Sequence, residues 1–262
     1  RYSDMIRSDA YKLDAYNMGL VDEKNRLNLY DGKVRVTDPM GNEYLKFVPK
    51  EYLEVIAERV EEWSYVKMPY LKSVGWKGLT DGPESGVYRV GPLGRLNAAD
   101  GMATPLADEE YELMHDTLGK PTQSTLAYHW ARLVETLYAA ERAVELAKDP
   151  EITSQDIRNP VGEPGEGIGI VEAARGVLIH HYKLSKDGLI EDLNVITPTA
   201  SNYAAMCISI RNAARSLISG GKVGEGVLNM VEMVYRAYDA CMACASHYTY
   251  GEMPLRIEIY DH

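Results

Sequence analysis

The sequence predicts an α+β fold in which long buried helices are combined with small antiparallel β elements. An apolar residue recurs every three or four positions through residues 124–148, which is typical of a long helix packed on one face. Residues 170–184 and 189–196 are β-like and flank the turn sequence Ser185-Lys-Asp-Gly188, which predicts a hairpin. No internal repeat or low-complexity segment divides the chain, so we expect one domain over residues 1–262.

The composition is ordinary for a globular protein, and it restricts the partners. Hydrophobic residues make up 45% of the 262 residues, and charged residues 26%, which allows a substantial core. The net charge of −11 argues against nucleic acid or an anionic membrane as main partner. Three cysteines make no disulfide framework, and we find no signal peptide or membrane span, so a cytoplasmic location is expected. Residues 1–12 read as mid-domain, so we expect an N-terminal portion to be missing.

Short elements joined by turns are predicted for the first part of the chain. Residues 28–47 indicate short strands around the turns Asp31-Gly32 and Pro39–Gly41. A short charged helix is predicted over Pro49–Glu62, because proline suits the first helical turn. Residues 63–105 are rich in Gly and Pro without periodicity, so we expect an irregular segment held by packing on other elements.

Longer helices are predicted for the second part. A short helix over Asp108–Leu118 precedes the long one, which Pro150 ends. We expect the apolar positions of the long helix to form one buried stripe: Leu126, Trp130, Leu133, Leu137, Ala140 and Val144. A loop is predicted over Pro160–Gly169. Two more helices and a last strand are expected over Asn202–Ile218, Val227–Ala245 and Pro254–Tyr260.

Two of the three cysteines lie in the segment Cys241-Met-Ala-Cys244, with His247 three residues further on. Two thiolates at this spacing lie within one helical turn and can bind one metal, but they do not complete its ligand set. A metal site, a redox-active dithiol and chance all remain open. A thioredoxin-type dithiol opens a helix in a βαβ unit, whereas this pair is predicted near the end of a helix.

The segment Glu172-Ala-Ala-Arg175-Gly176 places an arginine in a predicted apolar strand. An unpaired arginine is costly to bury, so Arg175 either pairs with an acid such as Glu172 or faces an anion or a reacting centre. Gly176 lets the backbone approach a neighbour closely.

Three other features are expected to be structural. His180 and His181 point to opposite faces of a strand, so we expect one packed and one exposed histidine rather than a joint metal site. The glycine-rich loop at 160–169 lacks the Lys-Ser/Thr of a P-loop and contains two glutamates, which argues against nucleotide binding. Cys207 is alone in a predicted helix, where a core position is expected.

Together, three separated motifs resemble the large subunit of nickel–iron hydrogenases. The family's C-terminal Asp-Pro-Cys-x-x-Cys-x-x-His is matched by Asp239–His247, with Ala240 in place of proline. Its Glu-Ala-Pro-Arg-Gly strand is matched by Glu172–Gly176, with Ala174 in place of proline. The Pro-Ser/Thr after the next strand is matched by Pro198-Thr199. Order and approximate spacing agree, so the whole chain looks like the C-terminal portion of such a large subunit.

A second set of segments looks like the cytoplasmic methanogen-type hydrogenase that works with heterodisulfide reductase. These segments are residues 18–22, 30–36, 86–93 and 100–106. The resemblance implies oxidation or production of dihydrogen, with electrons passing to an iron–sulfur small subunit and on to heterodisulfide reductase or ferredoxin. This chain has too few cysteines for a cluster of its own. Two alternatives stay open: a deazaflavin- or nicotinamide-reducing hydrogenase subunit, and a non-catalytic scaffold subunit, against which the cysteines argue.

The resemblance also implies a role for each matched residue. Cys241 would be a terminal thiolate on nickel, and Cys244 would bridge nickel and iron, which also carries CO and cyanide. Arg175 and Asp239 would form a catalytic polar canopy over the metals. Pro198-Thr199 would bind the cofactor, with the Thr199 hydroxyl donating to an iron-bound cyanide.

A further metal site and a missing part are implied as well. His247 would bind magnesium or iron together with a backbone carbonyl near Val195. The family's Arg-x-Cys-Gly-x-Cys pair and its proton-passing glutamate are absent, so the N-terminal part of the large subunit is an expected partner. Residues 248–262 follow the histidine after which many relatives are cut, which indicates an unprocessed form or a retained tail.

Overall fold

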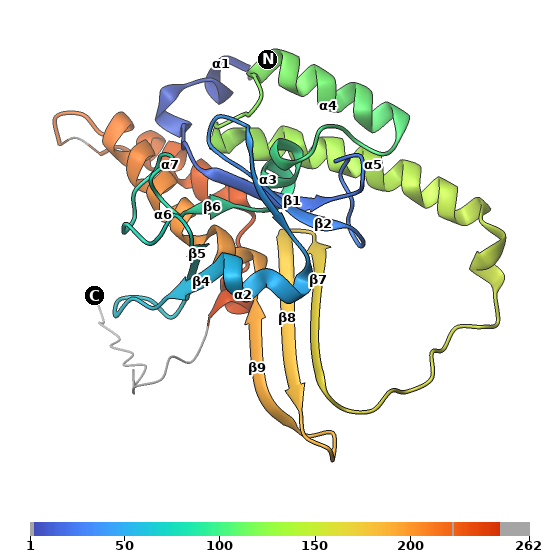
Figure 1. Ribbon diagram of the computed structural model, residues 1–262. Coiled ribbons are helices and arrows are strands. Elements are labelled where there is room, and N and C mark those ends of the chain that lie inside the picture. Colours follow the sequence, from blue (N-terminus) through green and yellow to red (C-terminus); the bar gives the residue numbers. More distant parts are fainter. Residues whose placement is uncertain (1–2, 222, 247–262) are drawn as a thin grey trace, which may run out of the picture.

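Small β-sheets packed among long helices make up the computed structural model, which describes residues 3–221 and 223–246 (Figure 1). This arrangement confirms the predicted α+β class with long helices. Three sheets are found within the described residues, with strand orders β3-β2-β1-β6, β4-β5 and β7-β8-β9. The predicted strand over 254–260 lies outside the described residues. None of the described helices is long and apolar enough to cross a membrane.

The four-stranded sheet lies in the first part of the chain. Its strands are β1 (Tyr16–Val21), β2 (Lys33–Thr37), β3 (Glu43–Phe47) and β6 (Tyr88–Arg89). β1 pairs antiparallel with β2 and parallel with β6, and β2 pairs antiparallel with β3. The strands predicted within residues 28–47 are therefore confirmed. The fully buried β1 was not predicted, because a strand buried on every residue lacks the alternation that marks a half-buried one.

The helix predicted over Pro49–Glu62 is wrong beyond its first turns. A 3-10 turn η2 (Pro49–Glu51) and the helix α2 (Tyr52–Val55) lead directly into strand β4 (Ile56–Arg59). β4 pairs antiparallel with β5 (Met68–Leu71), which lies in the segment predicted to be irregular. Ile56 lies opposite Leu71 and both are buried, so cross-strand burial outweighs the helical preference of this charged segment.

The predicted hairpin is confirmed as part of a third sheet, which projects from the body of the molecule (Figure 1). Its strands are β7 (Glu166–Ala173), β8 (Gly176–Leu184) and β9 (Ile190–Ile196), all antiparallel. The segment predicted as one strand over 170–184 is in fact two strands, because Ala173 pairs with Gly176 around a tight turn. Gly176 has a φ of 132°, which a residue with a side chain rarely adopts.

Helices supply most residues of the larger core cluster. The main helices are α3 (Gly91–Ala98), α4 (Pro105–Leu118), α5 (Tyr128–Lys148), α6 (Pro198–Leu217) and α7 (Glu225–Tyr238). Shorter pieces are α1 (Ser3–Ile6), η1 (Asp9–Tyr11), η3 (Thr125–Ala127), η4 (Pro150–Thr153) and α8 (Met242–Ala245). Every residue of α3 is buried, although its Gly-Pro sequence predicted no helix. The close packing of this helix depends on Gly94, because a Cβ at this position would lie only 2.6 Å from the Arg89 carbonyl oxygen.

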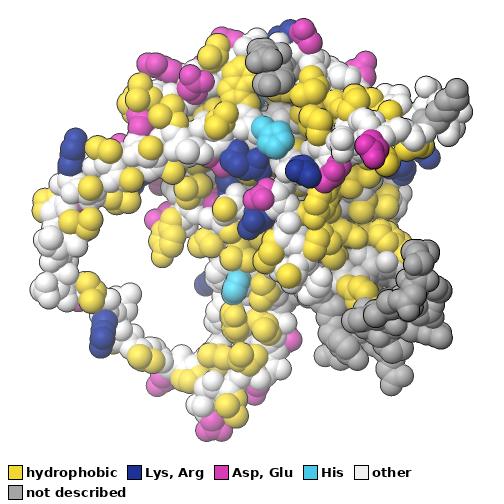
Figure 2. Space-filling view, turned by 180° about the vertical axis from the view of Figure 1, so that it is seen from behind, with side chains coloured by type: hydrophobic (Ala, Val, Ile, Leu, Met, Phe, Trp, Pro, Cys, Tyr) yellow, Lys and Arg dark blue, Asp and Glu magenta, His cyan; other side chains and the backbone are white. Residues whose placement is uncertain are grey.

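The apolar stripe predicted on the long helix is only partly buried, because Trp130 and Leu137 pack against the larger core cluster while the fully buried residues of α5 are others. These are Tyr128, Ala131, Val134 and Tyr138. In the predicted stripe, Leu133 is 68% exposed and Val144 is 53% exposed, although Leu126 is buried. Figure 2 shows hydrophobic side chains at the surface along the arm that leads to the long segment before β7. The predicted stripe therefore leaves an exposed apolar part at Leu133 and Val144, which the described part of the chain covers little.

Candidate metal centre

The site forms where α7 ends and the chain turns back toward the start of α6. The continuous helix predicted over 227–245 is wrong, because Asp239 takes a left-handed conformation (φ 53°, ψ 47°) directly after Tyr238. Cys241 then precedes α8, a single helical turn. Since helix α7 rather than a strand precedes the cysteine pair, the setting of a thioredoxin-type dithiol is missing.

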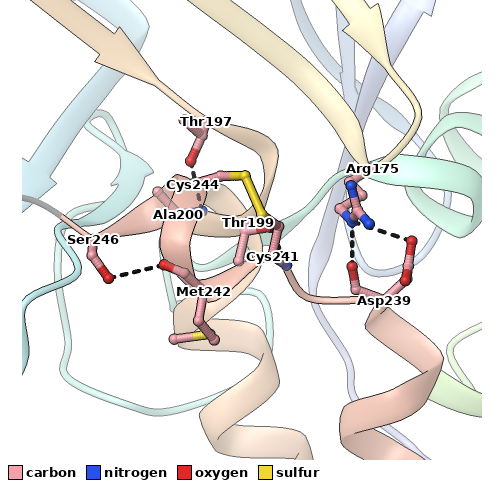
Figure 3. The surroundings of a disulfide bond; sticks show 9 residues. All are labelled: Arg175, Thr197, Thr199, Ala200, Asp239, Cys241, Met242, Cys244 and Ser246. Carbon is pink, nitrogen blue, oxygen red and sulfur yellow. Dashed lines mark hydrogen bonds and ion pairs between the residues drawn. A yellow bond between two sulfur atoms is a disulfide. The ribbon is translucent and has the colours of Figure 1, made fainter.

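The two cysteine sulfurs converge on one point at the first turn of α6 (Figure 3). Cys241 and Cys244 are joined as a disulfide, with their Cα atoms 5.4 Å apart. The backbone N–H of Cys241 donates to the Thr199 hydroxyl, with 3.1 Å between nitrogen and oxygen. Pro198 and Thr199 are buried in the first turn of α6, whose N-cap Thr197 accepts from the Ala200 N–H. The C-x-x-C and Pro-Thr motifs, about forty residues apart, therefore meet.

Arg175, in the turn between β7 and β8, reaches Asp239, two residues before Cys241 (Figure 3). Its Nε lies 3.1 Å from the Asp239 carboxylate and also donates to the Asp239 carbonyl oxygen. The side chains remain 39% and 53% exposed, so this ion pair faces solvent in the structure. Of the two alternatives for Arg175, the ion pair with Glu172 is not formed, because Glu172 lies on β7 with a side chain that is fully buried and paired with Arg95.

Sequence reasoning missed the buried cluster beneath that turn. Arg95 of α3 pairs with Glu172, 2.7 Å away, and with Glu135 of α5. Burial raises the pKa of Glu172 to about 7, while Arg95 and the Leu20 N–H act in the opposite direction. One signal was available: an arginine within the apolar segment Leu93-Gly-Arg-Leu96 needs an acidic partner if the segment is buried.

The remaining predicted site residues lie in different positions. Val195 is on β9 opposite His180, whereas His247 lies outside the described residues, so their joint metal site is not described. His181 contacts the Tyr52 hydroxyl and the Glu166 carboxylate, at 2.9 and 2.8 Å. His180 instead lies near Tyr182, so the histidines do face apart, but both are partly buried rather than one exposed.

The donor set fits half of a thiolate-bound metal centre. Once reduced, Cys241 and Cys244 offer two soft thiolates at one point, which suits nickel, iron or zinc. Within residues 3–221 and 223–246, no group of three or more His, Cys, Asp or Glu side chains is placed to hold a metal. Cys207 is a free, partly buried thiol on α6, and burial raises its pKa. A complete centre on this site therefore needs ligands from another source.

Backbone packing places the Arg175 turn against the start of α3, and Gly91→Ala tests this contact. Gly91 has a φ of +84°, and a Cβ there would lie 2.6 Å from the Arg175 carbonyl oxygen. The substitution is expected to destabilise the fold by about 3 kcal/mol, combining backbone strain with the steric conflict. Gly75→Ala is the matched control, since Gly75 has a φ of +89° with nothing within 4 Å. Gly75→Ala is expected to lower the free energy of unfolding, measured with denaturant, by about 1 kcal/mol. Equal losses of stability in the two variants would contradict the contact between Gly91 and the Arg175 turn.

Comparison with known proteins shows which family the chain belongs to. The family model described as nickel-dependent hydrogenase matches residues 4–247 of the chain. The chain belongs to the nickel-dependent hydrogenase family. The family resemblance predicted from the three motifs is therefore confirmed, and the matched range includes all of them.

The relatives similar to this chain include F420-non-reducing hydrogenases and an NAD-reducing hydrogenase. An iron-sulfur subunit of the F420-non-reducing hydrogenase of Archaeoglobus profundus is 49% identical, covering 98% of this chain and 54% of that protein. The matching subunit of the F420-non-reducing hydrogenase of Methanothermobacter marburgensis is 40% identical over 95% of this chain and 52% of its own length. The beta subunit of the NAD-reducing hydrogenase HoxS of Cupriavidus necator is 39% identical, over 94% of this chain and 50% of its own length.

Solved hydrogenases share the fold. A crystal structure of an NAD+-reducing [NiFe]-hydrogenase in the H2-reduced state superposes with a TM-score of 0.86 at 35% identity, covering 94% of this chain and 53% of that one. The [NiFeSe] hydrogenase of Desulfovibrio vulgaris Hildenborough gives a TM-score of 0.62 at 20% identity, over 94% and 55%, and shows the fold alone. This chain spans about half the length of the relatives it matches.

Proposed function

We propose that this chain is the C-terminal part of a hydrogenase large subunit, in which Cys241 and Cys244 hold half of a nickel–iron centre that oxidises or produces dihydrogen. The observation that supports this most is the meeting of three separated motifs. The Arg175 turn, the start of α6 and the cysteine segment are joined by the Arg175–Asp239 ion pair and the Cys241–Thr199 hydrogen bond. The three segments that resemble motifs of this family are thus linked by direct contacts, which supports the proposal.

The cysteines would act as ligands. We propose Cys241 as a terminal thiolate on nickel and Cys244 as a thiolate shared by nickel and iron, both after reduction of their disulfide. When bound, such a centre, with CO and cyanide on iron, supplies heterolytic cleavage of dihydrogen. Soft sulfur donors suit low-valent nickel and iron better than oxygen donors do. His247, with a carbonyl near Val195, is proposed to hold magnesium or iron at a separate site.

Three polar residues would complete the site: Arg175 as a fixed positive charge, Asp239 as a proton acceptor and Thr199 as a hydrogen-bond donor. The Arg175 guanidinium is always charged, so it would give the site a fixed positive potential when the metals are bound. Its contacts to both the carboxylate and the carbonyl of Asp239 hold that carboxylate beside the cysteine segment, where it can take up a proton. The Thr199 hydroxyl, next to Pro198, accepts from the Cys241 N–H, and its own O–H would donate to an iron-bound cyanide.

The exposed apolar face of α5 is proposed to pack against the remaining part of the large subunit. That part has to supply the other thiolates, since the described residues supply only two that converge. The relatives are about twice as long as this chain, so they contain enough polypeptide to cover the face. A neighbouring apolar pocket on the same side, of about 680 Å³, is lined by Trp130, Leu133 and Met233.

Leu133→Glu is expected to weaken this association at least tenfold, because an unpaired carboxylate at an apolar interface costs several kcal/mol. The measurement is recovery of the assembled large subunit, or of the complex where the two parts are separate chains. Leu189→Glu is the matched control, since Leu189 is 70% exposed at the tip of the β8–β9 hairpin and Leu133 is 68% exposed. Full recovery with Leu133→Glu would contradict the proposed packing.

Electrons are proposed to leave through an iron–sulfur small subunit toward heterodisulfide reductase or ferredoxin in the cytoplasm. The two relatives named F420-non-reducing support a deazaflavin-independent acceptor. The NAD-reducing relative keeps a nicotinamide acceptor as the alternative. Dihydrogen-dependent reduction of an artificial dye by the assembled, anaerobically matured complex tests the function. The absence of uptake would favour the non-catalytic scaffold.

A further inference from the structure

A buried arginine whose N–H donors all have acceptors lies beneath the turn that carries Arg175. Arg95 is only 3% exposed, and each of its guanidinium N–H groups has an acceptor. Nε and Nη2 donate to the two carboxylate oxygens of Glu135, and Nη1 donates to Glu172. The other two N–H groups donate to the carbonyl oxygens of Ala173 and Ala174, at 2.7 and 3.1 Å. All five donors of the guanidinium group are thereby used.

These contacts join three elements at the turn. Arg95 comes from α3, Glu135 from α5, and Glu172 lies at the end of β7 just before the turn. The two carbonyls belong to the residues immediately before Arg175, so the guanidinium fixes the backbone from which the Arg175 side chain extends. Arg175 itself is 39% exposed and has only Asp239 as its ionic partner among the described residues. Its position therefore depends on the turn rather than on packing around its side chain.

We propose that Arg95 is a positioning residue that holds the Ala173–Ala174–Arg175 turn, and with it the Arg175 guanidinium, in place beside Asp239, two residues before the cysteine pair. The proposal rests on the function proposed for Arg175. An arginine is needed because four separate groups accept from its five N–H donors: the carboxylates of Glu135 and Glu172 and the carbonyls of Ala173 and Ala174. Lysine has three donors on one nitrogen atom and cannot reach four separate groups. The two carboxylates also keep the buried cation paired, which makes its burial tolerable.

Arg95→Lys in the complete complex tests this proposal through backbone exchange. Loss of the two carbonyl contacts is expected to speed hydrogen–deuterium exchange at peptides covering residues 173–177 by about tenfold. Arg35→Lys is the matched control, because Arg35 is also buried and pairs with two carboxylates, Glu43 and Asp100, and one carbonyl, that of Ala98. The control is expected to speed exchange around β2 and to leave residues 173–177 unchanged.

Activity gives a second, separate readout. Arg95→Lys is expected to lower hydrogen uptake about tenfold in the wild-type background, and to add less than about twofold to Arg175→Lys, because both changes act through one guanidinium group. Unchanged exchange at residues 173–177 would overturn the proposal, whatever the uptake. Faster exchange at the turn with full uptake, while Arg175→Lys lowers uptake, would overturn the claim that the turn positions the Arg175 guanidinium. Full uptake in both variants would instead contradict the function proposed for Arg175.

Discussion

Cys241→Ser is expected to lower hydrogen uptake by the complete complex to background, a loss of at least about 100-fold. A serine hydroxyl is a hard, weakly acidic donor, so it cannot replace a thiolate on low-valent nickel without loss of affinity and of redox tuning. The substitution exchanges only the sulfur atom for oxygen, and the Cys241 N–H that donates to Thr199 is kept. Assembly of the complex should therefore survive. Uptake is measured with an artificial dye under reducing, anaerobic conditions.

The third cysteine provides the control. Cys207 is a free thiol on α6, outside the cysteine motif, and is partly buried. Cys207→Ser should leave uptake near the wild-type rate, with at most a small loss of stability. If Cys241→Ser also kept uptake near wild type, the catalytic interpretation would fail and the scaffold alternative would replace it.

Arg175→Lys is expected to retain nickel but to slow turnover about 100-fold, a loss similar to that of one preorganised donor at a reacting centre. Lysine keeps the positive charge but loses the planar group that holds Asp239 by both its carboxylate and its carbonyl oxygen. Its proton is also mobile, which weakens the fixed field next to the metals. The measurement combines the turnover rate with nickel content per complex.

Arg236→Lys is a suitable comparison. Arg236 lies on α7, three residues before Asp239, and pairs with Glu232 at the surface. Its side chain is 69% exposed, so turnover should stay within about twofold of wild type. Loss of nickel in Arg175→Lys would show that Arg175 helps to hold the metals rather than to act on the substrate. Unchanged turnover would remove Arg175 from the proposed site.

Local patterns predicted those elements that depend on neighbouring residues. The hairpin from β8 to β9 follows from Ser185-Lys-Asp-Gly188, because the turn chemistry and both flanking strands are continuous in sequence. The end of α7 was not predicted, because Asp239 has no glycine or proline beside it to mark a stop. The helix α3 was missed for the opposite reason. Its Gly91, Pro92 and Gly94 weaken an isolated helix, yet the two glycines permit close backbone contacts that only the folded chain reveals.

The candidate site was predicted by motif resemblance more than by residue spacing. Spacing alone indicated that Cys241 and Cys244 could share a metal, but nothing local connects them with Arg175. The pairing of Arg175 with Glu172, one of two alternatives for Arg175, is not formed, which shows the limit of nearest-neighbour reasoning. Residues three apart at a hairpin turn can point in different directions, and the true partners, Asp239 and Arg95, lie 64 and 77 positions away. The partly exposed stripe on α5 has the same origin, since sequence shows an apolar face but not what covers it.

Nickel content tests the central claim most directly. The claim is that this chain supplies two of the thiolates of a nickel–iron centre and depends on another part of the large subunit for the rest. Reduced chain on its own is expected to carry no stoichiometric nickel by elemental analysis, whereas the anaerobically matured complex with the remaining part should carry about one nickel per large subunit. About one nickel on the isolated chain, or none in the matured complex, would contradict the account.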